Sequence, residues 1–441
     1  MTQQPEVKYT EEQKRLRDQI EKKHGKTPEQ VREEKEKRIL DAIELREPDR
    51  VPVSFRITYF PGTYLGLSKK TAYYDPATWK KAALQTMVDF DPDMCQNYAG
   101  TSSGEVMDIL KPTTSKWPGG PLPDNITHQA IDVETMADDE YELLMTDPTD
   151  FVIRKMLPRA FEALKPLAKL PPLGERARMI NMLTPMFASD EFIEMGKALV
   201  AAGETQKRWQ EALGTSLAEE MDKIGLNPVG TMMAGAGGAP FDAVSDGYRG
   251  MRGTMLDMYR HPEELLTLLQ KMSDDRISRV TPVSPDAPCR QRRLPFALHR
   301  GTDGFLSDAQ FAKYYWPFLK RGLATSIENN YIPMPFCEGA FDSRIHHFLE
   351  LPKGKLVAHF DLTDMFRAKE ILGGHVCIMG NVPASLLQLG TPEDVDAYCK
   401  KLIEVCGKGG GLIITHGTTI DEAKPENVKA MVESAKKYHP K

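Results

Sequence analysis

The part of the chain from residue 332 onward constrains the fold most strongly, because short apolar runs there end on chemically reactive side chains. Residues 332–337 read IPMPFC and precede Glu338, residues 356–361 read LVAHFD, and residues 412–416 read LIITH. Each run is followed by glycine, proline or a polar turn. Parallel α/β barrels carry their active sites at the carboxyl ends of their strands. The pattern therefore predicts a barrel and places the functional residues at the ends of these runs.

Similar apolar runs recur along most of the chain and alternate with helical patterns. The further candidate strands are residues 49–55, 177–183, 229–233, 294–299 and 376–379, and residues 309–329 and 392–406 have helical periodicity. Near-continuous apolar strands that alternate with helices indicate a parallel sheet buried on both faces. About eight such units in roughly 390 residues favour a closed (β/α)8 TIM-like barrel over a doubly wound sheet.

The N-terminal segment differs from the rest in its high charge. Residues 9–46 contain only sparse apolar positions, and Gly25 and Pro28 divide them. Thr27 followed by Pro28 is typical of a helix start. We therefore expect a helical extension over residues 1–46, with two helices packed on the outside of a domain or on a second subunit, and a barrel over residues 47–441.

Composition excludes several classes of protein. The net charge is −6 and the isoelectric point is about 6.0, which gives no electrostatic case for binding nucleic acid or an anionic membrane. No apolar run reaches about 18 residues, and the N-terminus lacks the apolar core of a signal peptide. The six cysteines are scattered, as expected for reduced thiols. A cytoplasmic protein is the expectation.

Several motifs in the C-terminal segment resemble one known family. Residues 380–383 read GNVP, residues 390–395 read GTPEDV, residues 409–417 read GGGLIITHG and residues 425–427 read PEN. In this order the motifs are similar to the C-terminal segment of the uroporphyrinogen decarboxylase superfamily. Residues 239–259 and 50–55 also look like parts of that family. The resemblance implies a TIM-like barrel with a funnel-shaped pocket at the carboxyl ends of the strands.

The superfamily has two main chemistries, and an early motif distinguishes them. The decarboxylases carry an arginine-rich motif that pairs with porphyrin carboxylates, whereas the corresponding place here retains only Arg56. A substrate with several carboxylates needs several arginine forks. The resemblance therefore favours the corrinoid-dependent methyltransferase branch. It implies a separate corrinoid-binding protein whose cobalt accepts or donates the methyl group.

Methyltransferases of this branch bind zinc, often through His-x-Cys on one strand and cysteine on the last. Here Cys337 matches, Pro335 stands at the histidine place, and His416 lies just before the place of the last cysteine. We expect zinc to be held by Cys337 and His416, with Glu338 as a candidate third ligand and His299 and His359 as the alternatives for that place. A zinc ion with an open position can activate a methyl ether or a thiol. A buried structural cysteine is the alternative for Cys337, and a satisfied core histidine for His416.

Other polar residues at the ends of runs are candidates for acid–base chemistry or substrate contact. His359 and Asp361 are two residues apart on one predicted strand and so share a face. His299 follows another apolar run. These three are the candidates for acid–base catalysis, although a structural imidazole–carboxylate pair accounts equally well for the first two. The candidates for substrate binding are Asp303, Arg56 and Asn381.

Together these features predict a methyltransferase that moves a methyl group between a small methylated substrate and the cobalt of a corrinoid protein, with help from zinc. A methyl ether, methylamine or methylthiol is the expected substrate. Two alternatives stay open. One is a metal-free decarboxylase or lyase, which convergence of Arg56, Arg249 and Arg300 in the pocket would favour. The other is a non-catalytic corrinoid- or tetrapyrrole-binding protein. A homodimer capped by the N-terminal helices is a further expectation.

Overall fold

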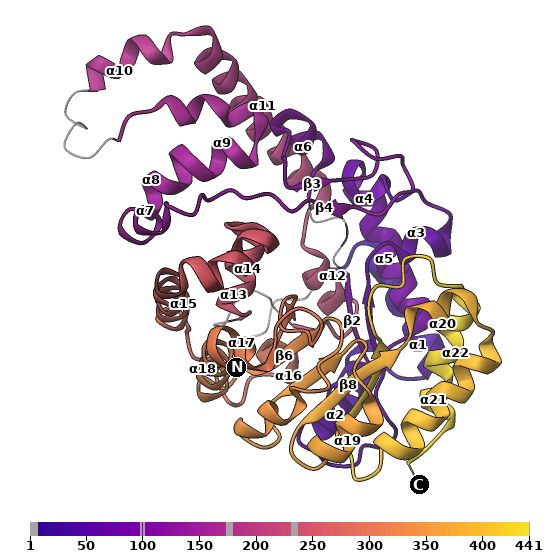
Figure 1. The fold of residues 1–441 in the computed structure, drawn as a ribbon. Coiled ribbons are helices and arrows are strands. Elements are labelled where there is room, and N and C mark those ends of the chain that lie inside the picture. The colour runs from indigo at the N-terminus through magenta and orange to yellow at the C-terminus, as the bar shows by residue number, and fades with distance from the viewer. Residues whose placement is uncertain (1–7, 98, 100–101, 173–179, 231–236, 441) are drawn as a thin grey trace, which may run out of the picture.

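A computed structural model describes residues 8–97, 99, 102–172, 180–230 and 237–440 of the chain. Its centre is a parallel barrel (Figure 1). β1 (Ser54–Ile57) pairs with β2 (Met94–Asn97). A second sheet runs in the order β5 (Arg293–Leu298), β6 (Ile332–Cys337), β7 (Val357–Phe360), β8 (Cys377–Val382) and β9 (Leu412–His416). All of these neighbouring pairs are parallel.

Backbone contacts join the two sheets into a ring. On one side, the Ile414 amide donates a hydrogen bond to the Pro52 carbonyl at 2.8 Å, which places β9 beside β1. On the other side, the Cys95 amide donates to the Asn227 carbonyl at 3.1 Å, so that residues 227–229 extend the ring beyond β2. This segment in turn abuts the start of β5, because a side chain at Gly230 would collide with the Arg293 carbonyl. The predicted (β/α)8 TIM-like barrel is thus confirmed.

Helices surround the ring and fill the connections. The first half of the barrel and the excursion after β2 contain α3 (Phe60–Leu65), α4 (Thr71–Tyr74), α5 (Pro76–Phe90), α6 (Gly104–Leu110), β3 (Ser115–Lys116), β4 (Gln129–Ala130), α7 (Tyr141–Thr146), α8 (Pro148–Phe151), η1 (Val152–Met156), α9 (Leu157–Ala160), η2 (Glu162–Lys169), α10 (Ile180–Phe187), α11 (Asp190–Leu213) and α12 (Leu217–Lys223). The second half contains α13 (Pro240–Gly247), α14 (Gly250–Arg260), α15 (Pro262–Ile277), α16 (Cys289–Arg292), α17 (Asp308–Gln310), η4 (Phe311–Tyr315), α18 (Trp316–Glu328), η5 (Ile345–Glu350), α19 (Met365–Leu372), α20 (Ala384–Leu389), α21 (Pro392–Cys406) and α22 (Pro425–Lys437). Within the described part of the chain, no helix is both long and apolar enough to cross a membrane.

The N-terminal extension forms the two predicted helices, α1 (Glu11–His24) and α2 (Pro28–Ile43). The Thr27 side chain caps α2, as its sequence predicts. The apolar face of α2, with Ile39 and Ile43, packs against a cluster that includes Val357 and Ile413 from the barrel strands. The helix therefore closes the amino-terminal end of the barrel, opposite the expected site. The division into units at residue 46 stays a prediction.

One of the predicted strands is wrong, and another lies mostly outside the described part of the chain. The run at 177–183 was expected to be a strand, but residues 180–183 open helix α10 and residues 177–179 lie outside the described part. A short, continuously apolar run has no periodicity that separates a strand from a buried helix. Of the run at 229–233, only residues 229 and 230 are described. Strand β2 was not predicted, because it is short and follows the turn-forming sequence Asp-Pro-Asp.

Candidate functional site

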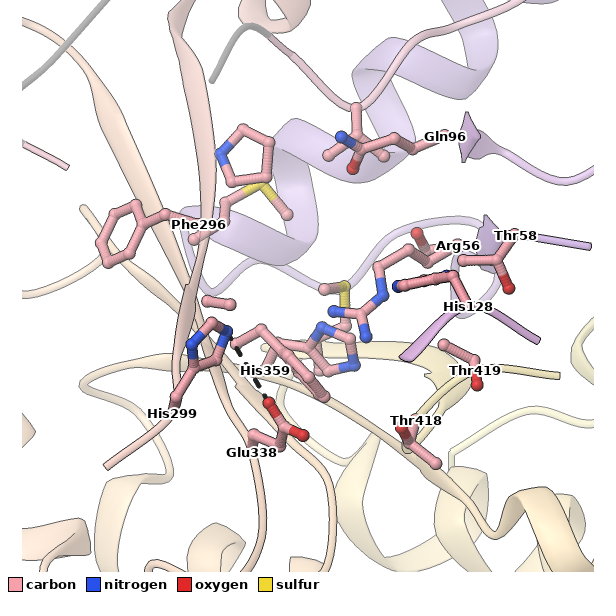
Figure 2. Close-up of a pocket in the computed structure, with 17 residues that line it drawn as sticks. Arg56, Thr58, Gln96, His128, Phe296, His299, Glu338, His359, Thr418 and Thr419 are labelled. Atoms are coloured by element: carbon pink, nitrogen blue, oxygen red, sulfur yellow. Dashed lines mark ion pairs between the residues drawn. The ribbon is translucent and has the colours of Figure 1, made fainter. Parts of the chain in front are cut away.

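A cavity of about 500 Å³ opens at the carboxyl ends of the barrel strands. Figure 2 shows its lining side chains, which come from all around the ring. Alternate residues of a barrel strand face the lumen. On β6 these are Met334 and Phe336, with Glu338 just beyond the strand, and on β1 they are Ser54 and Arg56. Four predicted site residues therefore line this cavity, namely Arg56, His299, Glu338 and His359.

An aromatic and cationic stack occupies one wall of the cavity. The guanidinium carbon of Arg56 lies 3.8 Å from the ring centroid of Phe336, at a distance suited to a cation–π contact. The Phe336 ring in turn lies 4.6 Å from the imidazole of His359, centroid to centroid. Arg56 is therefore held against the wall by the Phe336 ring, which fixes the position of its guanidinium with respect to the cavity.

His359 is buried, with 3% of its surface exposed. Its Nε2 lies 3.2 Å from the carbonyl oxygen of His416, so the proton sits on Nε2 and the lone pair on Nδ1. Burial, reinforced by the charge of Arg56, lowers the pKa of His359 well below its usual value. The imidazole is therefore neutral at physiological pH and has one nitrogen left to accept a hydrogen bond.

His299 stands at the mouth of the cavity and forms an acid–base cluster with two carboxylates. Its Nδ1 lies 2.6 Å from Oδ2 of Asp246, and its Nε2 lies 3.8 Å from Oε2 of Glu338. The hydrogen bond to Asp246 raises the pKa of His299, against the opposing effect of burial. The imidazolium form is therefore favoured here, in contrast to the neutral His359 on the cavity wall.

The backbone that presents His299 is held by a buried carboxylate. Asp242 accepts hydrogen bonds from the amides of His299 at 2.9 Å and Arg300 at 3.0 Å. The Tyr315 hydroxyl donates a third bond to Asp242 at 2.8 Å. Burial nevertheless raises the pKa of Asp242 to about 6. This clamp fixes the end of β5 at the point where His299 turns toward the cavity.

The expected zinc ligands Cys337, His416 and Glu338 do not come together. Adjacent residues of a strand point to opposite faces, so Glu338 lines the cavity while Cys337 lies in the core between strands and helices. Cys337 is fully buried, and burial raises the pKa of its thiol well above the usual value. Two strands, β7 and β8, separate β6 from β9. At about 4.8 Å per strand spacing, Cys337 and His416 are roughly 14 Å apart around the sheet.

Both ring nitrogens of His416 contact backbone groups around it. Its Nε2 accepts a hydrogen bond from the Arg56 amide at 3.1 Å, and its Nδ1 contacts the Thr418 carbonyl. Burial lowers its pKa to about 3. Among the described residues, no group of three or more histidine, cysteine or acidic side chains is arranged to hold a metal ion. In the described part of the chain the three expected ligands therefore do not meet at one point, and a zinc ion held by Cys337 and His416 stays a prediction.

The other three candidates do not line the cavity but hold loops around it. Asp361 accepts a hydrogen bond from the Gly339 amide at 3.0 Å, and burial raises its pKa. The Asn381 amide donates to the carbonyls of Asp361 at 3.0 Å and Thr363 at 2.8 Å. Asp303 forms an ion pair with Arg344 at 3.2 Å and accepts the Ser343 hydroxyl. All three therefore hold the conformation of loops around the cavity mouth and do not line the cavity themselves.

The arginines named for the decarboxylase alternative do not converge. Arg249 is buried against Asp257 at 2.5 Å in the helices outside the barrel. Arg300 pairs with Asp246 at 2.8 Å. Among the described residues that line the cavity, Arg56 is the one arginine. A further part of the cavity lining is apolar and includes Val229, Phe296 and Met379.

Some lining residues were missed by the sequence analysis. His128 comes from the excursion between β2 and the next barrel segment, and its Nδ1 lies 2.9 Å from the Tyr59 hydroxyl. His128 precedes the two-residue strand β4 and follows no apolar run in the sequence, so its sequence context carried no signal. Thr418 and Thr419 also line the cavity. They follow β9 directly, and the rule that placed His416 at a strand end could have included them.

Comparisons with known proteins agree with this architecture. A sequence model of the family Uroporphyrinogen decarboxylase (URO-D) matches residues 226–438. A protein named uroporphyrinogen decarboxylase from Syntrophotalea carbinolica is 26% identical over 209 residues, which are 46% of this chain and 58% of that protein. One of the same name from Chlorobium phaeovibrioides is 24% identical over 196 residues, which are 41% of this chain and 54% of that protein. The chain thus spans just over half the length of these curated relatives.

A solved structure resembles almost the whole chain. It is described as a methyltransferase from Methanosarcina mazei, and it superimposes with a TM-score of 0.53 at 15% sequence identity. The likeness covers 91% of this chain and 98% of that structure. At this identity the likeness establishes the shared fold.

Proposed function

From the premise that this chain belongs to the uroporphyrinogen decarboxylase superfamily, we propose that it is a methyltransferase that moves a methyl group between a small methylated substrate and the cobalt of a corrinoid protein. The observation that carries the proposal is the charge of the cavity wall, where Arg56 lies without the converging arginines that a polycarboxylate requires. The apolar wall suits an uncharged, methyl-bearing substrate. The similar structure named a methyltransferase adds support.

In methyl transfer a nucleophile attacks the methyl carbon while the bond from carbon to the leaving heteroatom breaks. The electron pair of that bond stays on the heteroatom, which then needs a proton unless it leaves as a stable group. The reduced cobalt of the partner's corrinoid would act as a second substrate and supply the attacking electron pair. The chain's own contribution is to bind the donor, exclude water and deliver the proton.

In this proposal His299 delivers that proton. Its side chain is 41% exposed at the cavity mouth, and Asp246 stabilises the imidazolium form. A general acid works best when its pKa lies near the working pH. In the reverse direction the same imidazole would accept the proton from an incoming hydroxyl or thiol. Glu338 lies close enough to His299 to influence its charge.

The remaining cavity residues would orient the donor. The free Nδ1 of His359 can accept a hydrogen bond from a substrate hydroxyl or amine. The guanidinium of Arg56 and the hydroxyl of Thr418 line the same cavity and would contact the donor, whereas the Thr58 hydroxyl donates to Asp421 and can only accept. The proposal includes no zinc step, because Cys337, His416 and Glu338 point in different directions.

The test uses chemically reduced cob(I)alamin as methyl acceptor and a panel of methyl ethers, methylamines and methylthiols as donors. The purified chain should form methylcobalamin, seen in its absorption spectrum, with at least one donor class. His299→Gln should slow transfer by about 100-fold or more, as typical for loss of a general acid. His439→Gln, an exposed histidine near the C-terminus, is the matched control and should leave the rate unchanged. Decarboxylation of uroporphyrinogen without methyl transfer would contradict the proposal.

A further inference from the structure

A positive charge lies inside the barrel, beneath the cavity of the candidate site. Arg293 is the first residue of β5 and is fully buried, with 0% of its surface exposed. Pro295, two residues after Arg293, lines the cavity, as does Val229, two residues after Asn227. Because alternate residues of an extended segment share a face, Arg293 and Asn227 lie in the layer of lumenal side chains below the cavity. Neither is among the described residues that line the cavity itself.

The guanidinium of Arg293 has only part of its hydrogen bonds satisfied. Its Nη2 donates to Oδ1 of Asn227 at 2.7 Å and to the Pro228 carbonyl at 2.6 Å. Within the part of the chain that the structure describes, Nε and Nη1 of Arg293 and Nδ2 of Asn227 are buried without a hydrogen-bond partner. All three atoms are donors. Buried polar groups in folded proteins are normally paired, so these donors call for an acceptor.

The charge of Arg293 also lacks a carboxylate partner. A guanidinium keeps its proton in proteins, so burial cannot remove the charge. Among the described residues, no carboxylate forms an ion pair with Arg293. The charge of Glu36 on α2 acts on Arg293 from a distance, but the Glu36 carboxylate pairs with Arg290 at 2.9 Å and accepts the Arg290 amide. Glu36 is therefore already neutralised.

Two nearby cysteines do not supply the missing negative charge either. Cys289 and Cys95 lie close enough to Arg293 to act on its charge, and both are buried. Burial raises the pKa of Cys95 to about 12 and also raises the pKa of Cys289. Both thiols are therefore neutral at physiological pH. A buried charge without a partner is strongly unfavourable, so the countercharge has to come from outside the chain.

We propose that the barrel interior beneath the cavity holds a site for one small monovalent anion, such as chloride, beside the guanidinium of Arg293. The N–H groups of Arg293 and Asn227 that lack partners donate to the ion. One negative charge neutralises one guanidinium, whereas a dianion would leave an excess charge buried in the barrel. The ion thus stabilises the layer of side chains on which the cavity rests. The site does not depend on the proposed function.

Thermal unfolding of the full chain tests the site, with sodium gluconate replaced stepwise by sodium chloride at constant ionic strength. Gluconate is too large for a buried site, so the midpoint temperature of the parent should rise by about 2 °C or more with chloride and then level off. Arg293→Met removes the charge at similar side-chain length and should abolish the rise. Arg292→Met is the matched control. Arg292 is partly exposed and donates to the Asn330 carbonyl at 2.9 Å, so this variant should respond to chloride as the parent does.

Bromide locates the ion directly and does not require any variant to fold. Crystals of the parent soaked in sodium bromide should show an anomalous diffraction peak in contact with the Arg293 guanidinium. A parent whose unfolding temperature does not respond to chloride would overturn the proposal. So would a response that persists in Arg293→Met, or bromide peaks confined to the surface of the molecule.

Discussion

The carboxylate of Asp93 ties three parts of the barrel together, and its replacement by asparagine is expected to destabilise the whole fold. The residue is 1% exposed at the start of β2. Its Oδ1 accepts from Arg38 of α2 at 2.6 Å and from Arg50 at 2.9 Å. Its Oδ2 accepts from Arg50 at 2.7 Å and from the Val53 amide at 2.8 Å. Asparagine keeps one acceptor oxygen but turns an amide group toward a guanidinium.

The expected cost follows from what remains after the substitution. Removing one partner of a buried ion pair typically costs about 3–5 kcal/mol, because the other charge stays buried without compensation. Arg38 keeps its contact with Asp49 at 2.6 Å, whereas Arg50 keeps at most one of its two bonds to residue 93. We therefore expect the lower end, about 3 kcal/mol, for Asp93→Asn. Asp286→Asn, on an exposed residue, should change the free energy of unfolding by less than about 0.5 kcal/mol.

Urea titration followed by tryptophan fluorescence measures this difference. The two arginines hold the pKa of Asp93 below its usual value despite burial. A lowered pKa gives stability that is fully present above the unfolded value of about 3.9 and is lost as pH falls toward the folded value. The gap between parent and Asp93→Asn should therefore be full at pH 7 and shrink below about pH 4. A gap at pH 7 no larger than that of Asp286→Asn would refute the reasoning.

Three further predictions concern the site. Asp246→Asn removes the main cause of the raised pKa of His299. The alkaline limb of the pH profile of methyl transfer should therefore move to lower pH. A limb that does not move would contradict the role of His299 as the general acid. Phe336→Leu removes the ring under Arg56 and with it roughly 1 kcal/mol of cation–π interaction. KM for the donor should rise several-fold while kcat changes less, and steady-state kinetics measure the two constants separately. Cys337→Ala should lower the free energy of unfolding by roughly 1–2 kcal/mol without changing bound zinc per chain, and loss of stoichiometric zinc in that variant would show that the thiol is a ligand after all.

The strands of the second sheet could be predicted closely from the sequence. The runs at 332–337 and 412–416 match β6 and β9 residue for residue. Each of these strands is buried on both faces, so apolar residues occupy all positions except Thr415 and His416, and the limits of the run mark the limits of the strand. Residues 177–183 were predicted to be a strand as well, but residues 180–183 open a helix instead. Composition alone does not distinguish the two when the run stands far from a sheet.

The candidate site was harder to predict, because it depends on which face each side chain takes. Cys337 and Glu338 are neighbours in sequence, but the pleat sends one into the helix layer and the other into the cavity. Nothing in the sequence of residues 332–337 shows whether the odd-numbered or the even-numbered residues face the lumen. The partner of His299 is Asp246, which lies on a helix far away in sequence. Such pairings arise from the closure of the ring and have no local signal.

The central claim is that this cavity transfers methyl groups rather than removing carboxylates. The direct measurement offers the purified chain cob(I)alamin with a panel of methyl donors and, in parallel, uroporphyrinogen. The account predicts methylcobalamin from at least one donor class, abolished or strongly slowed in His299→Gln, and no decarboxylated porphyrinogen. Release of carbon dioxide from uroporphyrinogen, with no methylcobalamin from any donor, would contradict it.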